Sequence, residues 1–293
     1  MKQLFEKVSL PQQNVHLKQS VWHYFWNAFG IICCGELMSI GALFLFEWLF
    51  SIHITGDNEI LFQLFGTLLT VIIFVLVQKK EDQRSWMSLG LIKKDFLKHY
   101  VLGHVIGMFM LSGALFITYL FGGVTFEGME MKDPFLIFLF FIAFMIQGFE
   151  EELLCRGFVM YGLGYAKSST YAILINSLFF ALLHLGNDGL SVLSFLNLVV
   201  CGISFSLMAV YFDDIWVASG AHSMWNFAQG NFYGILVSGI NVGPSVFRFH
   251  LQGSHLIAGG LFGLEGGIGT TFIEILSIVV LCYVYMRKIK RNV

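Results

Sequence analysis

Long apolar runs constrain the fold of this chain more than any other feature of its sequence. The stretch Phe135–Met145 contains no polar side chain, and similar stretches recur from one end of the chain to the other. A helix needs about 20 apolar residues to cross a bilayer. By this measure about eight spans are expected, at Val21–Phe50, Ile60–Gln78, Val101–Phe121, Phe135–Tyr161, Ser168–Leu185, Leu190–Phe212, Ile215–Ser238 and Thr270–Met286.

The composition supports a membrane location. Of the 293 residues, 57% are hydrophobic and 12% are charged, whereas soluble domains carry about 25% charged residues. The net charge of -2 gives no basic footprint for nucleic acid. The sequence therefore predicts an all-α, polytopic transmembrane helical bundle, in which residues 1–293 form a single integral membrane domain within the lipid bilayer.

The basic side chains predict how the chain is oriented. Eight spans place both termini on one side, and the Lys- and Arg-rich links, including Lys79–Lys98, then share that side. The opposite links carry only Lys132 and Arg248, so the positive-inside rule puts both termini in the cytoplasm. Residues 1–20 lack the apolar core of a signal peptide and are expected to remain as a cytoplasmic lead. Residues 85–100 are expected to form an amphipathic helix on the inner leaflet.

Five cysteines lie in apolar stretches, and no Cys-x-x-Cys pair is present. This pattern predicts neither disulfides nor a structural zinc site. The cysteines are expected to pack between helices as small hydrophobic side chains. They are Cys33, Cys34, Cys155, Cys201 and Cys282.

Three consecutive carboxylates follow the apolar run of the fourth span. Glu152 and Arg156 are four residues apart, so they share a helical face and are expected to form an ion pair. Glu151 is rotated about 100° from Glu152, beyond easy reach of that pair. A desolvated carboxylate without a partner is suited to take a proton from water and to return it to a leaving group. Glu151 is therefore the predicted general base, while Glu150 has a rim or structural role.

Two further polar motifs lie on separate apolar helices. Phe180 and His184 share one face of the fifth span, and His222 and Asn226 share one face of the seventh. An Asn amide beside an imidazole could hold a developing oxyanion. Each motif alone could instead link helices by hydrogen bonds. Together with the carboxylates they favour a functional site, because ionisable groups are costly inside a bilayer.

These motifs, in this order, resemble those of the intramembrane CAAX-protease and bacteriocin-processing family, also called the Abi or type II CAAX prenyl endopeptidase-like family. The resemblance covers roughly residues 134–230, the expected catalytic core. The family's Glu-Glu-x-x-x-Arg, Phe-x-x-x-His and His-x-x-x-Asn/Asp motifs match Glu151 to Arg156, Phe180 to His184 and His222 to Asn226.

The resemblance implies a helical membrane endopeptidase that cuts a peptide or protein at the membrane. In such an enzyme Glu151 and His184 would activate water, and His222 and Asn226 would stabilise the tetrahedral intermediate. Glu152, Arg156 and Phe180 would support them. The substrate could be a prenylated C-terminus, but nothing in the sequence specifies prenyl binding. The absence of a eukaryotic-type targeting signal favours processing of a bacterial peptide, or self-protection against bacteriocins, at the plasma membrane.

Metal dependence is open at the level of sequence. The alternative to a metal-free glutamate mechanism is a zinc site with Glu151, His184 and His222 as three ligands. No His-Glu-x-x-His motif is present, and Asn226 is a better oxyanion donor than zinc ligand. A carboxylate–imidazole pair can activate water alone, so the expectation is that no cofactor is needed.

Two other classes of function remain as alternatives. The buried acids and histidines could form the proton relay of a transporter, although corresponding broken spans in two halves are not found. The chain could also bind a membrane partner without cutting it, as an immunity protein. Three outlying acids, Glu36, Glu265 and Glu274, are expected to make bonds across helices.

The expected span limits conflict with a common site. Counted at about 1.5 Å per residue, they put Glu151 nearer the cytoplasmic face and His184 nearer the opposite face. The two side chains can meet only if these limits shift, or if the fourth and fifth helices bend or differ in length. Gly148 and Gly157 flank the acidic cluster and would allow a bend.

Overall fold

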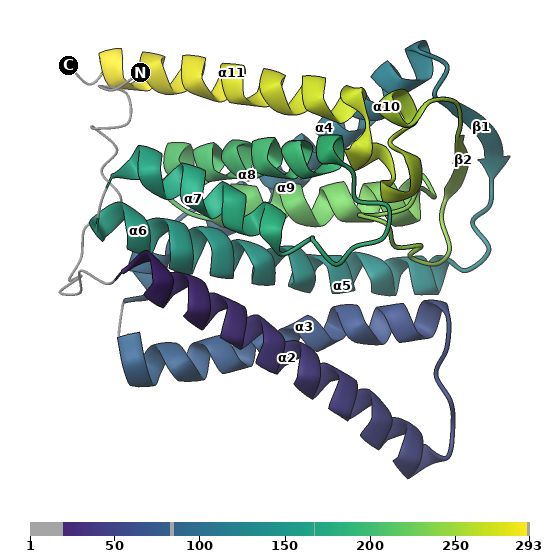
Figure 1. Cartoon of the computed structure of the whole chain (residues 1–293), viewed down its shortest axis with the longest axis horizontal. Helices are drawn as coiled ribbons and strands as arrows, with labels where there is room; N and C mark the ends of the chain where they lie inside the picture. Colours follow the sequence, from purple (N-terminus) through teal and green to yellow (C-terminus); the bar gives the residue numbers. More distant parts are fainter. Residues whose placement is uncertain (1–19, 83–84, 167, 292–293) are drawn as a thin grey trace.

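The computed structural model describes residues 20–82, 85–166 and 168–291, so the expected cytoplasmic lead lies outside the described residues except for Ser20. The chain is 75% helical and forms an all-α bundle (Figure 1). Its helices are α2 (Val21–Phe50), α3 (Asp57–Val77), α4 (Phe96–Leu120), α5 (Pro134–Glu152), α6 (Tyr161–Ala166), α7 (Ser169–Leu182), α8 (Val192–Phe212), α9 (Trp216–Phe227), α10 (His255–Ala258) and α11 (Ile268–Arg291).

Six helices of the described chain are long and apolar enough to cross a membrane. They are α2, α3 with the turn that follows it, α4, the continuous helix from Pro134 to Gly164, α8 and α11. The expected fifth and seventh spans correspond to the shorter helices α7 and α9. The predicted membrane bundle is thus confirmed, while two of its members are shorter than the hydropathy of the sequence suggests.

The start of α2 and the end of α11 lie at the same end of the bundle (Figure 1). α2 and α3 form a hairpin that splays away from the other helices, while α5 runs through the middle of the view. At the other end β1 (Val124–Met129) pairs antiparallel with β2 (Phe247–Leu251). Both strands alternate apolar and polar residues, as in Phe247-Arg248-Phe249-His250-Leu251. This pattern is typical of strands, but a search for long apolar spans does not detect it.

The helix that begins as α5 changes its hydrogen-bond pattern after Glu152. Residues Leu153–Met160 form a π-helical segment, in which each turn holds an extra residue, before α6 completes the same long helix. Segments of this kind occur frequently at functional sites. The change falls inside the Glu151–Arg156 motif, so the motif spans the junction of the two helical forms.

α9 is held against its neighbours by small side chains. A Cβ added at Gly107 of α4 would lie 2.9 Å from the Cα of Ala221, and one added at Gly148 of α5 would lie 2.8 Å from the amide nitrogen of Ser223. Such close backbone approach is how membrane helices pack without a hydrophobic driving force between them. The packing fixes α9, and with it His222, between α4 and α5.

The segment before α4 holds the start of α9 and is not the single helix that was expected at residues 85–100. Trp86–Leu89 is a single 3₁₀ turn, and Leu89 has no exposed surface. The Ile215 amide donates to the carbonyl of Gly90, and the Trp216 indole donates to the carbonyl of Ile92 at 2.7 Å. Leu89 therefore packs inside the protein, whereas Trp86, Met87 and Phe96 remain exposed.

Candidate active site

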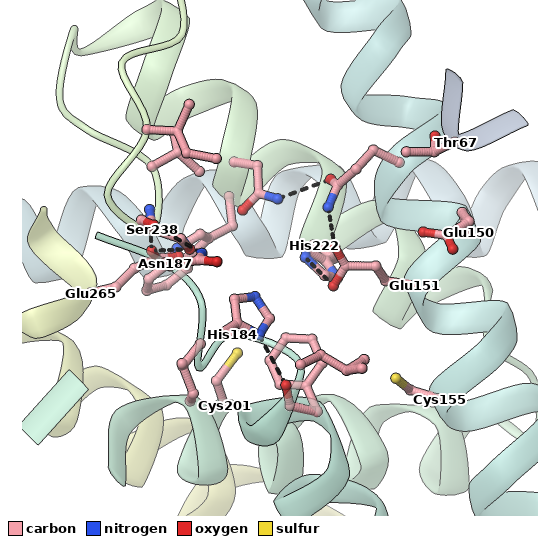
Figure 2. A pocket seen from close by; sticks show the side chains of 18 of the residues that line it. Thr67, Glu150, Glu151, Cys155, His184, Asn187, Cys201, His222, Ser238 and Glu265 are labelled. Carbon is pink, nitrogen blue, oxygen red and sulfur yellow. Dashed lines mark hydrogen bonds and ion pairs between the residues drawn. The ribbon is translucent and has the colours of Figure 1, made fainter. Parts of the chain in front are cut away.

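A cavity of about 650 Å³ lies inside the bundle and collects side chains from α2, α3, α5, α7, α8, α9 and α11. Figure 2 shows Glu151, His184 and His222 facing this space from different helices. Asn226 also lines it. The structure therefore brings all four residues that the sequence analysis proposed as catalytic to the wall of one cavity.

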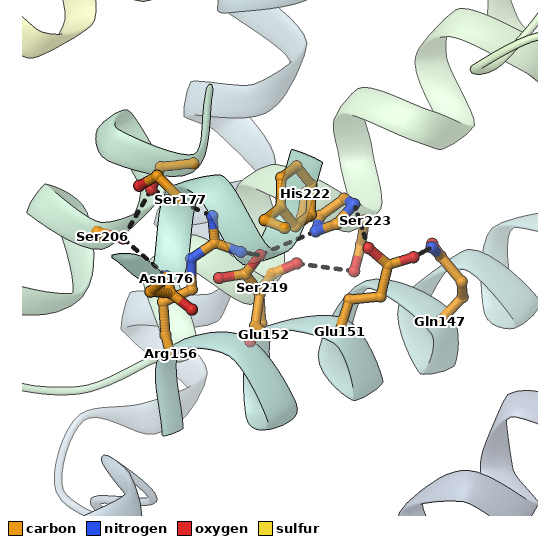
Figure 3. Close-up of polar contacts among 12 residues, drawn as sticks. Gln147, Glu151, Glu152, Arg156, Asn176, Ser177, Ser206, Ser219, His222 and Ser223 are labelled. Carbon is orange, nitrogen blue, oxygen red and sulfur yellow. Dashed lines mark hydrogen bonds and ion pairs between the residues drawn. The ribbon is translucent and has the colours of Figure 1, made fainter. Parts of the chain in front are cut away.

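His222 lies between two carboxylates. Its Nδ1 is 2.9 Å from Oε1 of Glu152, and its Nε2 is 3.9 Å from Oε2 of Glu151 (Figure 3). Because an ionised carboxylate can only accept, Nδ1 carries the proton of this hydrogen bond. The bond fixes the ring so that Nε2 points toward Glu151. Oε2 of Glu151 has no hydrogen-bond partner among the described residues, so it is free to accept a proton.

Glu152 also accepts from Nη1 of Arg156 at 2.8 Å, and both side chains are completely buried. Arg156 donates from Nη2 to the carbonyl of Gly202 at 3.2 Å. Its guanidinium lies 4.7 Å from the centre of the Phe180 ring and 5.6 Å from that of Phe205. The expected ion pair is therefore present, and it shares Glu152 with His222, a link that the helical spacing alone did not suggest.

His184 lies just beyond the end of α7, with its ring beside that of Phe180 at 4.9 Å. Its Nδ1 lies 2.9 Å from the carbonyl oxygen of Phe180. A carbonyl can only accept, so Nδ1 carries the proton and Nε2 keeps its lone pair. No hydrogen bond or ion pair joins His184 to Glu151 in the described part of the chain. The two groups face one cavity without touching.

The lengths of the helices remove the conflict over depth. α7 has 14 residues, about 21 Å, and ends short of the roughly 30 Å needed to cross the hydrocarbon core. Glu151 lies 15 residues before Ala166, where α6 ends, and His184 lies 15 residues after Ser169, where α7 begins. The long helix and α7 pack against each other, so the two side chains reach a similar depth. The expected fifth span, Ser168–Leu185, was too long at its far end.

Gln147 connects two of the candidate residues, and sequence reasoning missed it. Its Nε2 donates to Oε1 of Glu151, and its Oε1 accepts from Nδ2 of Asn226 at 3.0 Å. Gln147 precedes Glu151 by four residues, which places both side chains on one helical face. This spacing is the sequence feature that could have predicted their contact. The amide ties α5 to α9 and holds Glu151 so that Oε2 is the oxygen turned to His222.

The outlying acids differ in their surroundings. Glu265 accepts from the amide and hydroxyl of Ser238 and from the indole of Trp225, so it joins the segment before α11 to α9. Glu274 is fully buried on α11. Glu36 and Glu150 line the cavity and have no hydrogen bond among the described residues.

The residues of a zinc site do not converge in this conformation. Among the described residues, no three His, Cys, Asp or Glu side chains form a group that could hold a metal ion. Nδ1 of His222 and Nδ1 of His184 are both engaged in hydrogen bonds. All five cysteines are described, and each is a free thiol.

Residues 133–228 match a protein-family model described as type II CAAX prenyl endopeptidase Rce1-like. This segment of the chain is therefore similar to the CAAX-protease family. The segment runs from the residue before α5 to the residue after α9, and it contains every residue of the three motifs. No curated protein matches the chain. The CAAX-protease family, together with the six apolar helices, identifies an integral membrane protein from a family of proteases.

We expect Gln147→Ala to lower kcat of peptide cleavage by about 10- to 100-fold, because small displacements of reacting groups cost rates of this size. Gln147→Glu should fail as well, since its carboxylate would repel Glu151. Purified variants would be compared for kcat, KM and thermal unfolding. Normal cleavage by Gln147→Ala would show that the amide bridge does not hold Glu151 in place.

Proposed function

We propose that this protein is an intramembrane endopeptidase that hydrolyses a peptide bond with a water molecule activated at Glu151. The observation that supports this most directly is the position of His222. Its ring is fixed by Glu152 on one side and directed at the free oxygen of Glu151 on the other. An imidazole that only linked helices would not need a second carboxylate facing a cavity.

In the proposed reaction, Glu151 takes a proton from water as the water oxygen bonds to the scissile carbonyl carbon. The lone pair on Nε2 of His184 accepts a hydrogen bond from the same water and orients it. When the carbon–nitrogen bond breaks, Glu151 returns its proton to the leaving amine. Atoms and charge therefore balance without a further reactant, and the products are a carboxylic acid and an amine, which become a carboxylate and an ammonium ion by proton transfer.

His222 and Asn226 would hold the oxyanion of the tetrahedral intermediate. Glu152 stabilises a protonated imidazole, which then offers its Nε2–H to the oxygen. Asn226 donates one amide hydrogen to Oε1 of Gln147, and its second amide hydrogen can be donated to the intermediate. The catalytic core under this proposal is residues 134–230, and Phe180 supports it by packing its ring on Arg156 and His184.

The proposed substrate is a peptide or protein at the membrane. The proposed process is bacteriocin maturation, self-immunity or CAAX-type processing. The proposed location is the bacterial plasma membrane with both termini in the cytoplasm. The basic side chains near the end of α11, Lys288, Lys290 and Arg291, lie at the same end of the bundle as the start of α2, which supports this orientation.

The proposal is tested by incubating the purified protein in lipid nanodiscs with a mixture of apolar peptides in water enriched in ¹⁸O. We expect fragments with new termini, and each N-terminal fragment should carry one ¹⁸O atom in its new carboxyl group. Mass spectrometry reads both features together. If no peptide is cut while the protein stays folded and binds peptides, the chain is a binding protein and the proposal is wrong.

We further propose that cleavage needs no metal. Dialysis against EDTA or 1,10-phenanthroline should leave the rate of peptide cleavage unchanged. A catalytic metal contributes several kcal/mol to transition-state stabilisation, so its removal would lower the rate by more than about 100-fold. A loss of that size that added zinc restores would keep the peptidase and replace the glutamate mechanism. Glu151, His184 and His222 would then be the ligands to test.

A further inference from the structure

The charges around the cavity do not balance. The described residues that line it include Glu36, Glu150, Glu151, Glu265 and Glu274 but no Lys or Arg. Arg156 lies behind the wall, where Glu152 engages it. A cleft lined by charges of one sign attracts ligands of the opposite sign.

Two of these five acids have partners within the protein. Glu265 binds Ser238 and Trp225, and Glu151 binds Gln147 and faces His222. Glu274 lies on α11, and it has no hydrogen bond or ion pair with Glu150 or Glu151 among the described residues.

Glu150 differs from Glu151 and Glu265. Its side chain is buried, with an exposed fraction of 5%, and it has no hydrogen-bond or ion-pair partner among the described residues. Figure 2 shows its carboxylate turned to the cavity near Thr67. A buried charge without a partner is costly, so this orientation calls for a partner that the described chain does not contain.

Glu36 of α2 lines the same side of the cavity, where α3 contributes the polar side chains Gln63 and Thr67. Ionised carboxylates at Glu36, Glu150 and Glu151 would repel one another. A positive group placed between Glu36 and Glu150 would offset this repulsion and would give the buried Glu150 carboxylate a partner.

We propose that Glu36 and Glu150 form a subsite that binds a Lys or Arg side chain of the substrate. This inference rests on the proposed peptidase function and specifies its substrate. Glu150 adjoins Glu151, and an extended peptide advances about 3.3 Å per residue. The basic residue therefore lies within about two positions of the scissile bond. The long apolar stem of Lys or Arg suits the walls that Leu64 and Phe144 provide.

The test uses ten-residue fluorogenic peptides that are apolar except at one scanned position, which carries Lys, norleucine or Glu. Norleucine has nearly the shape of Lys without its charge. With the full-length protein in nanodiscs, we expect kcat/KM for the best Lys peptide to exceed that of its norleucine partner by at least about tenfold. Glu150→Gln and Glu36→Gln should each reduce this ratio toward one. Glu274→Gln, a matched change of a buried acid, should keep it.

Peptide binding to the Glu151→Gln variant, measured by thermal shift, gives a second readout that does not need cleavage. If the protein cuts Lys and norleucine peptides equally, or if Glu150→Gln keeps the preference, the subsite is wrong and the peptidase stands. If Lys peptides bind selectively through Glu150 but nothing is cut, the subsite stands and the peptidase is wrong. Equal binding without cleavage overturns both.

Discussion

Glu151→Gln is expected to lower kcat of peptide cleavage by about 10³-fold, within the range that general acid–base groups contribute. The amide keeps the shape of the side chain and can still bond to Gln147. It cannot take a proton from water, and it places an N–H or a weak acceptor where Oε2 faces His222 at 3.9 Å. We expect KM to change little, because Glu151 acts on the water rather than on the substrate's flanking residues.

The control for this experiment is Glu274→Gln. Glu274 is also a buried glutamate beside the cavity. It lies on α11 and makes no hydrogen bond or ion pair with the four candidate catalytic residues among the described residues, so cleavage should continue at nearly the wild-type rate. Both variants would be checked for membrane insertion and thermal unfolding. Cleavage by Glu151→Gln at more than about a tenth of the wild-type rate would remove Glu151 from the role of general base.

The same variant separates the alternative functions. A protein that protects the cell by binding a partner would keep its phenotype with Gln at position 151, because the shape of the cavity is unchanged. A proton-coupled transporter would lose transport but would show no cleaved peptide in the wild type. Only a peptidase loses product formation while it keeps peptide binding.

Helical spacing was sufficient to predict the contacts within each motif. Glu152 and Arg156 pair because residues four apart share a face, and the same rule puts the ring of Phe180 beside His184. Both features depend on one helix alone. The sequence contains that information in full, and the family model matches the same segment.

Contacts between helices could not be predicted in this way. The position of His222 between two carboxylates depends on how α9 packs on α5, and the bridge through Gln147 joins the same two helices. A single sequence does not state which faces meet. The close approach of Gly148 to Ser223 determines this register.

The predicted ends of the helices were also wrong, because apolar residues continue beyond the last residue of a helix. Leu183 and Leu185 are apolar, yet α7 ends at Leu182. The expected seventh span continued to Ser238, whereas α9 ends at Phe227 and a short π-helical turn ends at Phe232. The protein can end these helices within the bundle because neighbouring helices and the following loop cover the free backbone groups.

The largest effect on stability is expected from Arg156→Met. The change removes the hydrogen bonds to Glu152 and to the carbonyl of Gly202, and it leaves the Glu152 carboxylate in a site with no exposed surface. Breaking a buried ion pair from one side costs about 3–5 kcal/mol. In a chain of this size we expect the apparent Tm in detergent to fall by about 10 °C. Arg156→Lys keeps the charge but loses the planar contact with Phe180, so its Tm should lie between those of the wild type and Arg156→Met.

A double variant distinguishes stability from catalysis at this position. Replacing both partners, with Glu152→Leu added to Arg156→Met, removes the uncompensated charge, and pairs replaced by apolar residues are often neutral or stabilising. Recovery should be incomplete, because the Nδ1–H of His222 is then buried without an acceptor, at a cost of about 1–3 kcal/mol. Cleavage should not return, since nothing holds the imidazole against Glu151. A double variant that regained both Tm and activity would mean that Glu152 serves the fold alone, and that His222 is oriented by its packing against Phe180 and Phe205.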